Sequence, residues 1–166
     1  MIKYFSLIIL CLCLHGWASE DAWQEYSFLL SDVKIVCKLP QAPEIWETAE
    51  GRTWLKCESD GVLFSAMCQA QPFPDVDNTR MIRKFIKATP PFEGYVCVES
   101  TLLQTKDKIT VDTTWESKDI SIQPWDTVKE RRFFTKKGLY SFFVAYSKQV
   151  SIPPYSFYFE SIKFKK

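Results

Sequence analysis

Two pairs of acidic residues are the clearest candidates for acid–base chemistry in this chain of 166 residues. Two carboxyl groups can give and take protons in a reaction when both reach the same reacting group. Asp75 and Asp77 form the first pair, but they precede a stretch with helical spacing, where an aspartate usually caps the helix. Glu99 and Asp112 form the second pair, and they meet only if the strands that carry them are neighbours.

The sequence offers fewer candidate residues for nucleophilic or metal-dependent catalysis. Ser31 and Lys34 match the bare Ser-x-x-Lys spacing, but they run into a predicted strand and do not share one face of a helix. His15 is the only histidine, and it lies in a segment that we expect to be removed. Its loss excludes catalytic triads and zinc sites that need histidine. We therefore predict a protein that is not an enzyme, with no catalytic residue, no metal site and no cofactor.

Residues 1–18 have the organisation of a secretory signal peptide. Lys3 precedes a mostly apolar run, and small residues lie next to the expected cleavage position at Ala18. We predict cleavage there and export to the periplasm, the cell envelope or the medium, with a retained anchor as the alternative. Residues 19–166 are predicted to form a single domain, in which no stretch has the apolar length of a membrane span.

The exported chain is expected to be electrically neutral. Removal of Lys3 lowers the number of basic residues from 21 to 20, which equals the number of acidic residues. Nucleic acids and anionic lipids favour basic surfaces, so we expect neither of them as an obligatory partner.

Four cysteines remain after the predicted cleavage, and an even number in an oxidising compartment is compatible with up to two disulfides. The hairpin described next separates Cys57 from Cys68 by roughly 13 Å along the strands. A disulfide cannot bridge that distance, so we predict that these two cysteines are not bonded to each other. Any bridge then involves Cys37 or Cys97, and four buried free thiols are the alternative.

The stretch Thr53–Ala70 predicts a β-hairpin. Its turn is Asp60-Gly61, because a two-residue type I′ turn needs positive φ at both positions. This turn places Cys57 opposite Phe64, Leu55 opposite Ala66 and Thr53 opposite Cys68, all on the face directed to the core.

The stretch Arg131–Lys148 contains the strand around which the rest of the chain must pack. Leu139–Ser147 is apolar on both faces of a period-two repeat, and such a strand needs cover on both faces. We therefore place it in the middle of a sheet. Asn78–Ala88 predicts a helix with an apolar stripe and a basic outer side, which we interpret as a solvated face.

The other elements follow from local patterns. Strands are predicted over Trp23–Leu30, Val33–Leu39, Gly94–Thr105, Lys108–Ser117, Asp119–Gln123 and Thr127–Thr135. Ile45–Glu50 is predicted to be irregular or briefly helical. Tyr155–Phe164 is predicted to be a closing helix, although its aromatic content also permits a strand.

The order of these elements resembles the PsbP-like superfamily. The resemblance lies in the strand ending LPQAP, the hairpin GRTWLKCESDGVLFSAMCQAQP, the helix that follows, and the stretch RRFFTKKGLYSFFVAYSK with the later YSFYFESIKF. It implies an α+β fold in which an antiparallel β-sheet is flanked by helices on both faces, an α/β/α sandwich. Members of that superfamily bind or stabilise partners, and the resemblance carries no motif of functional residues.

These observations favour an exported, non-catalytic binding or adaptor domain that acts through an unidentified protein partner. Tryptophans at strand ends or in loops are its expected contacts, because tryptophan is enriched where proteins bind one another. The alternative is a carrier of a small apolar ligand in a cavity between sheet and helix. The oligomeric state stays open. The four candidate contact residues are Trp46, Trp54, Trp115 and Trp125.

Overall fold

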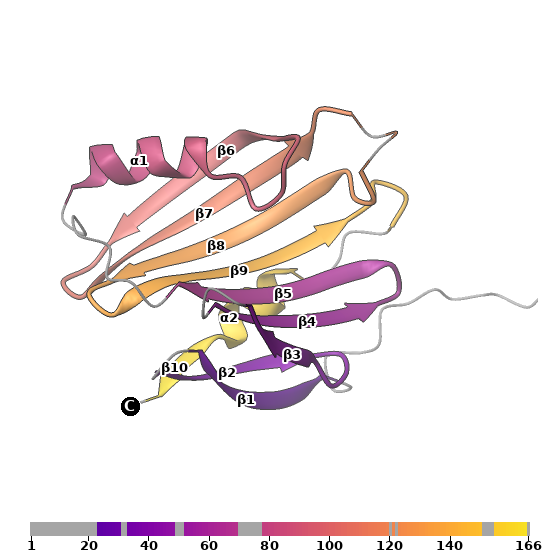
Figure 1. Ribbon diagram of the computed structural model, residues 1–166, viewed down its shortest axis with the longest axis horizontal. Helices are drawn as coiled ribbons and strands as arrows, with labels where there is room; N and C mark the ends of the chain where they lie inside the picture. Colours follow the sequence, from indigo (N-terminus) through magenta and orange to yellow (C-terminus); the bar gives the residue numbers. More distant parts are fainter. Residues whose placement is uncertain are drawn as a thin grey trace, which may run out of the picture.

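Two antiparallel sheets and two short helices make up the computed structural model (Figure 1). The structure describes residues 23–30, 33–48, 52–69, 78–119, 121, 123–150 and 155–165. The predicted signal peptide therefore lies outside the described residues, as do Ser31, Asp75 and Asp77. Within the described part of the chain, neither helix is long and apolar enough to cross a membrane.

The larger sheet has seven strands, and the strand predicted to be central is at its centre. The sheet order is β3-β4-β5-β9-β8-β7-β6, with β9 in the fourth place and buried along nearly its whole length. The strands are β3 (Glu44–Glu47), β4 (Thr53–Ser59), β5 (Val62–Gln69), β6 (Tyr95–Gln104), β7 (Lys108–Ser117), β8 (Thr127–Thr135) and β9 (Gly138–Tyr146).

One face of this sheet is covered by the smaller sheet and by α2 (Tyr155–Ser161), and we call it the α2 face. The smaller sheet has the order β1-β2-β10, with β1 (Gln24–Leu30), β2 (Val33–Leu39) and β10 (Lys163–Lys165). Its apolar side packs on the strands β4, β5 and β9. The core there is rich in aromatic residues, including Trp23, Phe64, Phe142 and Tyr158.

The opposite face is covered in part by α1 (Thr79–Ala88), and we call it the α1 face. Ile82 and Ile86 of α1 are buried against the strands β6, β7 and β8, as the predicted apolar stripe requires. Figure 1 shows α1 lying along β6 and β7, well away from β3 and β4. The half of the α1 face formed by β3, β4 and β5 is therefore not under the helix.

The predicted α/β/α sandwich is wrong. Strands make up 60% of the described residues and helices only 14%. The closing segment explains the difference, because its helix ends at Ser161 and the chain then forms β10, which pairs with β2. The layer over the α2 face is thus mainly a second sheet with one short helix, and the fold is mostly β.

The hairpin and its register are confirmed. Asp60 and Gly61 have φ values of 50° and 74°, as a type I′ turn requires. Cys57 pairs with Phe64 and Thr53 pairs with Cys68, so each of the expected cross-strand pairs forms.

Four local predictions need correction. Residues 44–47 form the edge strand β3, which pairs with β4, in place of the irregular connection expected from Ile45. The described residues between 119 and 123 are not in a strand. The N-cap of α1 is Asn78, whose side chain accepts a hydrogen bond from the backbone N–H of Met81 at 3.1 Å. The predicted closing helix stops at Ser161.

Candidate functional site

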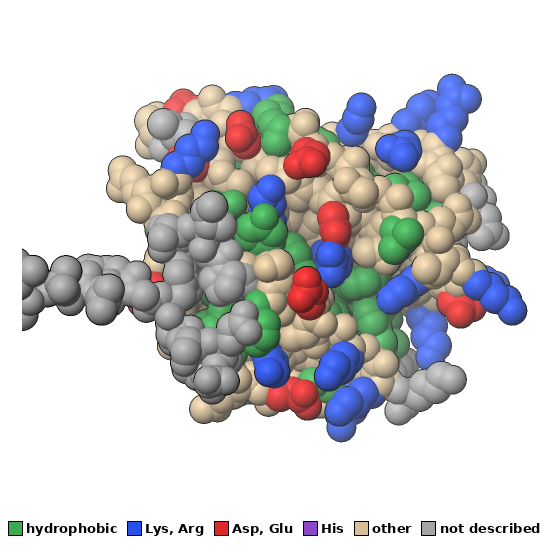
Figure 2. Space-filling view, turned by 180° about the vertical axis from the view of Figure 1, so that it is seen from behind, with side chains coloured by type: hydrophobic (Ala, Val, Ile, Leu, Met, Phe, Trp, Pro, Cys, Tyr) green, Lys and Arg blue, Asp and Glu red, His purple; other side chains and the backbone are tan. Residues whose placement is uncertain are grey.

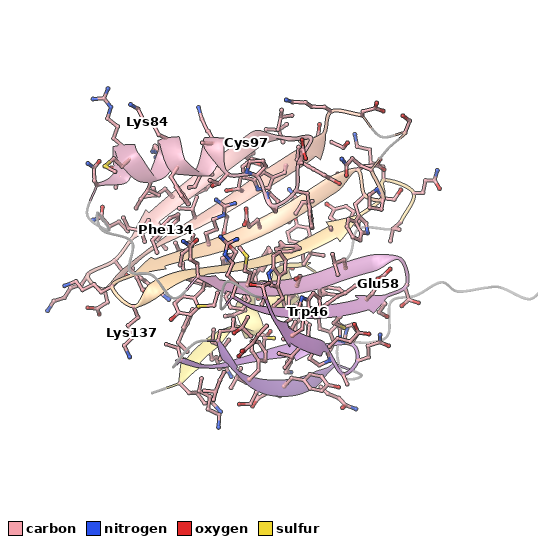
Figure 3. All side chains as sticks on the ribbon, viewed as in Figure 1. Trp46, Glu58, Lys84, Cys97, Phe134 and Lys137 are labelled. Atoms are coloured by element: carbon pink, nitrogen blue, oxygen red, sulfur yellow. The ribbon has the colours of Figure 1, made fainter. Side chains whose placement is uncertain are left out.

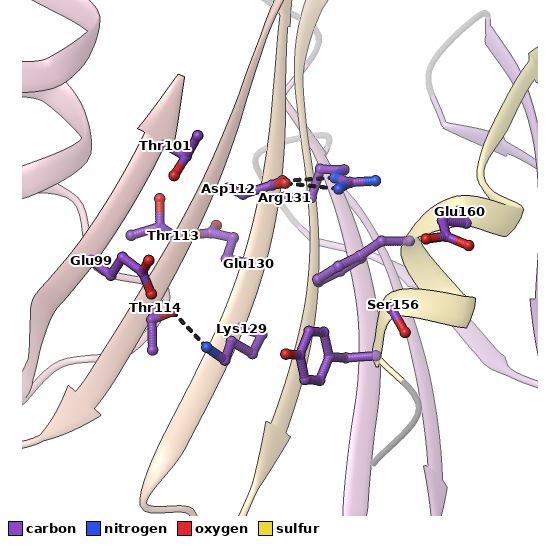
Figure 4. A pocket seen from close by; sticks show the side chains of 12 residues that line it. Glu99, Thr101, Asp112, Thr113, Thr114, Lys129, Glu130, Arg131, Ser156 and Glu160 are labelled. Atoms are coloured by element: carbon purple, nitrogen blue, oxygen red, sulfur yellow. Dashed lines mark hydrogen bonds and ion pairs between the residues drawn. The ribbon is translucent and has the colours of Figure 1, made fainter. Parts of the chain in front are cut away.

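The large sheet has a hollow on each face, and the two hollows differ in chemistry. The first lies on the α2 face between strands β6, β7, β8 and helix α2, has a volume of about 200 Å³, and is here called the polar groove (Figure 4). The side chains around it are mostly charged or hydroxylated. They include Glu99, Thr101, Asp112, Thr114, Lys129, Arg131, Tyr155, Ser156, Phe159 and Glu160.

The charges of the polar groove are largely satisfied by one another. Arg131 donates two hydrogen bonds to the carboxylate of Asp112, each of 2.7 Å, and these bonds raise the pKa of Arg131. Lys129 donates to the hydroxyl of Thr114 at 2.8 Å. Figure 2, which views the molecule from the side opposite to Figure 1, shows acidic, basic and apolar side chains interleaved over that surface.

The aromatic side chains of α2 are engaged by the same cations. The Lys129 ammonium lies 5.5 Å from the ring centre of Tyr155, and the Arg131 guanidinium lies 5.2 Å from that of Phe159. Cation–π contacts of this kind hold α2 against the sheet. The polar groove thus has a clear structural role in attaching the helix.

The second candidate acid pair, Glu99 and Asp112, lies in this groove. Glu99 of β6 is opposite Thr114 of β7, and Asp112 is opposite Thr101, so the two acids occupy diagonal positions on neighbouring strands. Both carboxylate oxygens of Asp112 accept hydrogen bonds from Arg131. Asp112 is thus engaged in an ion pair with the neighbouring strand, and the arrangement adds no support for acid–base catalysis.

The second hollow lies on the α1 face, between the C-terminal end of α1 and strands β4, β5, β8 and β9, and has a volume of about 330 Å³. We call it the aromatic hollow, because large apolar side chains form its walls. Its described lining consists of Arg52, Trp54, Met67, Gln69, Phe85, Thr89, Pro90, Pro91, Glu130, Arg132, Leu139, Ser141 and Phe143.

A buried ion pair lies at the base of the aromatic hollow. The Arg132 Nε donates to Glu130 at 2.7 Å, and the second carboxylate oxygen of Glu130 accepts from the indole N–H of Trp115 at 2.9 Å. Arg132 also donates to the Thr89 hydroxyl at 2.8 Å and to the Thr89 carbonyl. These bonds attach the end of α1 to the centre of the sheet.

Sequence reasoning missed this ion pair, although a signal for it exists. Val128, Glu130, Arg132 and Phe134 alternate along β8 and therefore share one face. Both apolar members of the set are buried, which implies that the charged residues between them are buried too. Opposite charges at positions two apart on such a face indicate an internal pair.

Two of the predicted contact residues form an aromatic patch beside the hollow. Trp46 is 43% exposed on the edge strand β3 (Figure 3). Its ring is stacked on that of Trp54, with 6.5 Å between ring centres and an angle of 5° between planes. Trp54 in turn meets Phe143 edge-on at 6.2 Å, which joins the patch to the hollow.

The other two tryptophans have different environments. Trp115 is completely buried on β7 and packs in the core of the α1 face, so the prediction that it contacts a partner at the surface is wrong. The reason is its period-two position, which it shares with buried Ile109 and Val111. Trp125 is half-buried, with its ring 5.6 Å from that of Phe92.

All four described cysteines are free thiols, and the confirmed hairpin register keeps Cys57 four residues out of step with Cys68, as predicted. Burial raises the pKa of Cys37 to about 12 and that of Cys68 to about 11. Thiols with raised pKa values are poor nucleophiles, because the thiolate is the reactive form. Among the described residues, no three His, Cys, Asp or Glu side chains lie close enough together to hold a metal ion.

Comparisons with protein-family models, with curated proteins and with solved structures give no match to this chain. Nothing therefore links it to the PsbP-like superfamily, and that resemblance stays a prediction. By its fold, the described part of the chain is a mostly β protein with two sheets and two short helices.

Proposed function

We propose that this protein is an exported, non-catalytic binding domain that contacts a protein partner through the patch formed by Trp46 and Trp54. The observation that carries the proposal is the position of these two rings, which are stacked on each other at the edge of the large sheet. A rigid aromatic pair at a surface loses little conformational entropy when it binds, and tryptophan is the residue type most often found in binding hot spots.

The surroundings of the patch support the proposal. Two further apolar side chains are exposed here, Leu29 of β1 and Ile45 of β3, and both line a third hollow. All four residues of β3 are exposed, and among the described residues no strand pairs with its outer side. An edge strand with apolar side chains is a surface onto which another chain can add.

A site-specific cross-linking experiment tests the proposal. A photoreactive amino acid at Trp46 is expected to capture one defined partner in the native cell envelope. The same group at Lys84, which is exposed on α1 (Figure 3), is expected to capture none. Trp46→Ala is expected to weaken binding of the captured partner while leaving the unfolding midpoint unchanged. Equal capture from both positions contradicts the proposal.

Export is tested separately. Fractionation of cells that express the whole chain is expected to find the protein outside the cytoplasm. Its mass is expected to correspond to a chain that begins after Ala18. A full-length protein in the cytoplasm contradicts this part of the proposal.

The second candidate function is a carrier of a small apolar ligand. The observation that favours it is the aromatic hollow, which lies between sheet and helix and is walled by Trp54, Phe85 and Phe143. Native mass spectrometry of freshly purified protein decides between the two functions. A persistent added mass favours the carrier, and a bare chain favours the binding domain.

A further inference from the structure

The base of the aromatic hollow carries two polar side chains that are directly opposite each other. Arg132 of β8 pairs with Ser141 of β9, and both line the hollow although both residues are buried. Buried polar groups in proteins nearly always have hydrogen-bond partners. The hydrogen bonds that these two side chains already make therefore show whether donors remain free to bind a ligand.

Arg132 has donor capacity that the described part of the chain does not use. A guanidinium group carries five N–H bonds. Three are accounted for, by Glu130, by the hydroxyl of Thr89 and by the carbonyl of Thr89. The remaining two N–H bonds and the hydroxyl of Ser141 make no further hydrogen bond among the described residues, while the guanidinium lies 5.7 Å from the ring centre of Trp115.

The charge of the hollow favours a single negative charge. Among the described lining residues, Arg52 and Arg132 are positive and Glu130 is negative. Glu130 is paired with Arg132, so the net charge of +1 comes from the exposed Arg52. A carboxylate is the anion whose planar pair of oxygens matches the N–H bonds of arginine. Trp54, Phe85 and Phe143 give the hollow large apolar surfaces, so the group that carries the carboxylate is expected to be apolar as well.

The size of the hollow limits the ligand to about one residue. Its volume of about 330 Å³ is at the lower end of the range for ligand pockets. The C-terminal residue of a polypeptide fits these conditions, because its α-carboxylate and its own side chain lie close together. An internal Asp or Glu supplies a carboxylate but no apolar group of its own.

We propose that the aromatic hollow binds the C-terminal residue of the partner polypeptide. An apolar side chain of that residue lies against Trp54 and Phe143, and its carboxylate accepts hydrogen bonds from Arg132 and Ser141. This inference rests on the proposed function, in which the partner is a protein. The stacking of Trp46 on Trp54 makes the hollow continuous with the exposed patch, over which the preceding residues of the partner run.

Titration of the whole exported protein with short peptides tests the inference. An acetylated polyalanine peptide that ends in Phe with a free carboxylate is expected to bind and to change the fluorescence of the protein's tryptophans. The same peptide with an amidated C-terminus is expected to bind about tenfold more weakly or worse, since hydrogen bonds to a charged group are lost. Equal binding of the two peptides overturns the inference.

Two matched serine variants identify the contact. Ser141→Ala removes a hydroxyl without a partner in the described chain, so it is expected to keep the unfolding midpoint and to weaken binding of the acid peptide severalfold. Ser65→Ala is the control on the same face, because that hydroxyl already donates to the Leu55 carbonyl at 2.6 Å. It is expected to lower stability and leave binding unchanged. Identical binding by Ser141→Ala and the unmodified protein overturns the assignment.

Two further outcomes separate this inference from the proposed function. If 3-phenylpropionate binds as tightly as the peptide, the hollow takes free acids and the C-terminal assignment is overturned in favour of a carrier. If neither peptide nor acid binds but Trp46 still captures a defined partner, this inference is overturned and the proposed function stands.

Discussion

Arg131 and Arg132 are neighbours on β8, yet they form ion pairs on opposite faces of the same sheet. Each has its Nε 2.7 Å from a carboxylate oxygen, of Asp112 on the α2 face and of Glu130 on the α1 face. The side chains of the first pair are 24% and 45% exposed, and those of the second are 5% and 1% exposed. Two ion pairs with the same N···O distance therefore lie in very different surroundings.

The difference in burial determines what each pair can do. Water screens the pair on the α2 face, so it contributes little free energy and its charges neutralise each other in the polar groove. The pair on the α1 face is removed from water, so each charge depends on the other and on Thr89 and Trp115. Only that pair holds strong hydrogen-bond donors next to an apolar hollow.

The largest expected effect comes from breaking the buried pair. Glu130→Ala leaves the Arg132 guanidinium buried without its countercharge, and we expect it to lower the free energy of unfolding by about 3–5 kcal/mol. It also removes the acceptor of the Trp115 indole. Urea denaturation followed by circular dichroism measures the change.

The control replaces both partners at once. The double variant Glu130→Leu, Arg132→Met is expected to recover most of the lost stability, because no charge remains buried. A loss below about 1 kcal/mol in the single variant contradicts the comparison, because that is the magnitude expected of an exposed pair.

The core of the α2 face is expected to be sensitive to alkaline pH. The ordinary thiol pKa is 9.0, and burial raises the pKa of Cys37 to about 12 and that of Cys68 to about 11. Between pH 9 and these values the unfolded chain has lost the thiol protons and the folded chain still holds them. The contribution of the two thiols to the free energy of unfolding is therefore complete below about pH 9. It falls as the pH rises, with a slope of up to about 1.4 kcal/mol per pH unit for each thiol.

Urea midpoints measured from pH 7 to pH 11 check this expectation. Cys37→Ala is expected to be less stable at pH 7, because a cavity is left, but to lose less on going to high pH. The matched variant Cys97→Ala removes a thiol that is only partly buried, and its pH profile is expected to change less than that of Cys37→Ala. Identical slopes in all three proteins contradict the prediction.

Several elements could be predicted because their signals are local. Gly138–Tyr146 is apolar at nearly every position, so the sequence alone indicates a strand with cover on both sides. The turn residues Asp60 and Gly61 determine the hairpin register, which in turn places Cys57 and Cys68 too far apart to bond. In both cases the pattern lies within a few consecutive residues.

Other features could not be predicted, because they depend on segments that are distant in sequence. The closing segment changes from helix to strand at Ile162 because β2 provides a free edge for β10. Of the four predicted tryptophan contacts, Trp46 and Trp54 meet only through the pairing of β3 with β4. Arg132 reaches Thr89 across 43 residues of sequence, and no short-range pattern indicates that contact.

A smaller effect is expected from the hydroxyl of Thr113. This residue is buried on the α1 face, opposite Glu130, and its hydroxyl oxygen has no hydrogen-bond partner in the described part of the chain. Thr113→Val replaces the hydroxyl by a methyl group of similar size, so we expect the free energy of unfolding to rise by about 1 kcal/mol. Urea denaturation measures the change in the free energy of unfolding. A loss of stability contradicts the expectation that this hydroxyl is buried without a hydrogen-bond partner.

The smallest effect is expected from the exposed pair, and it completes the comparison. Asp112→Ala removes the carboxylate bound by Arg131, and we expect the free energy of unfolding to fall by about 0.5 kcal/mol, because water screens both charges. The loss is expected to shrink further in 1 M salt, whereas the loss in Glu130→Ala persists there. A double-mutant cycle with Arg131→Ala isolates the coupling of the two side chains from the contact between Arg131 and Phe159. A coupling above about 2 kcal/mol contradicts the comparison, since the exposed pair then behaves as the buried pair does.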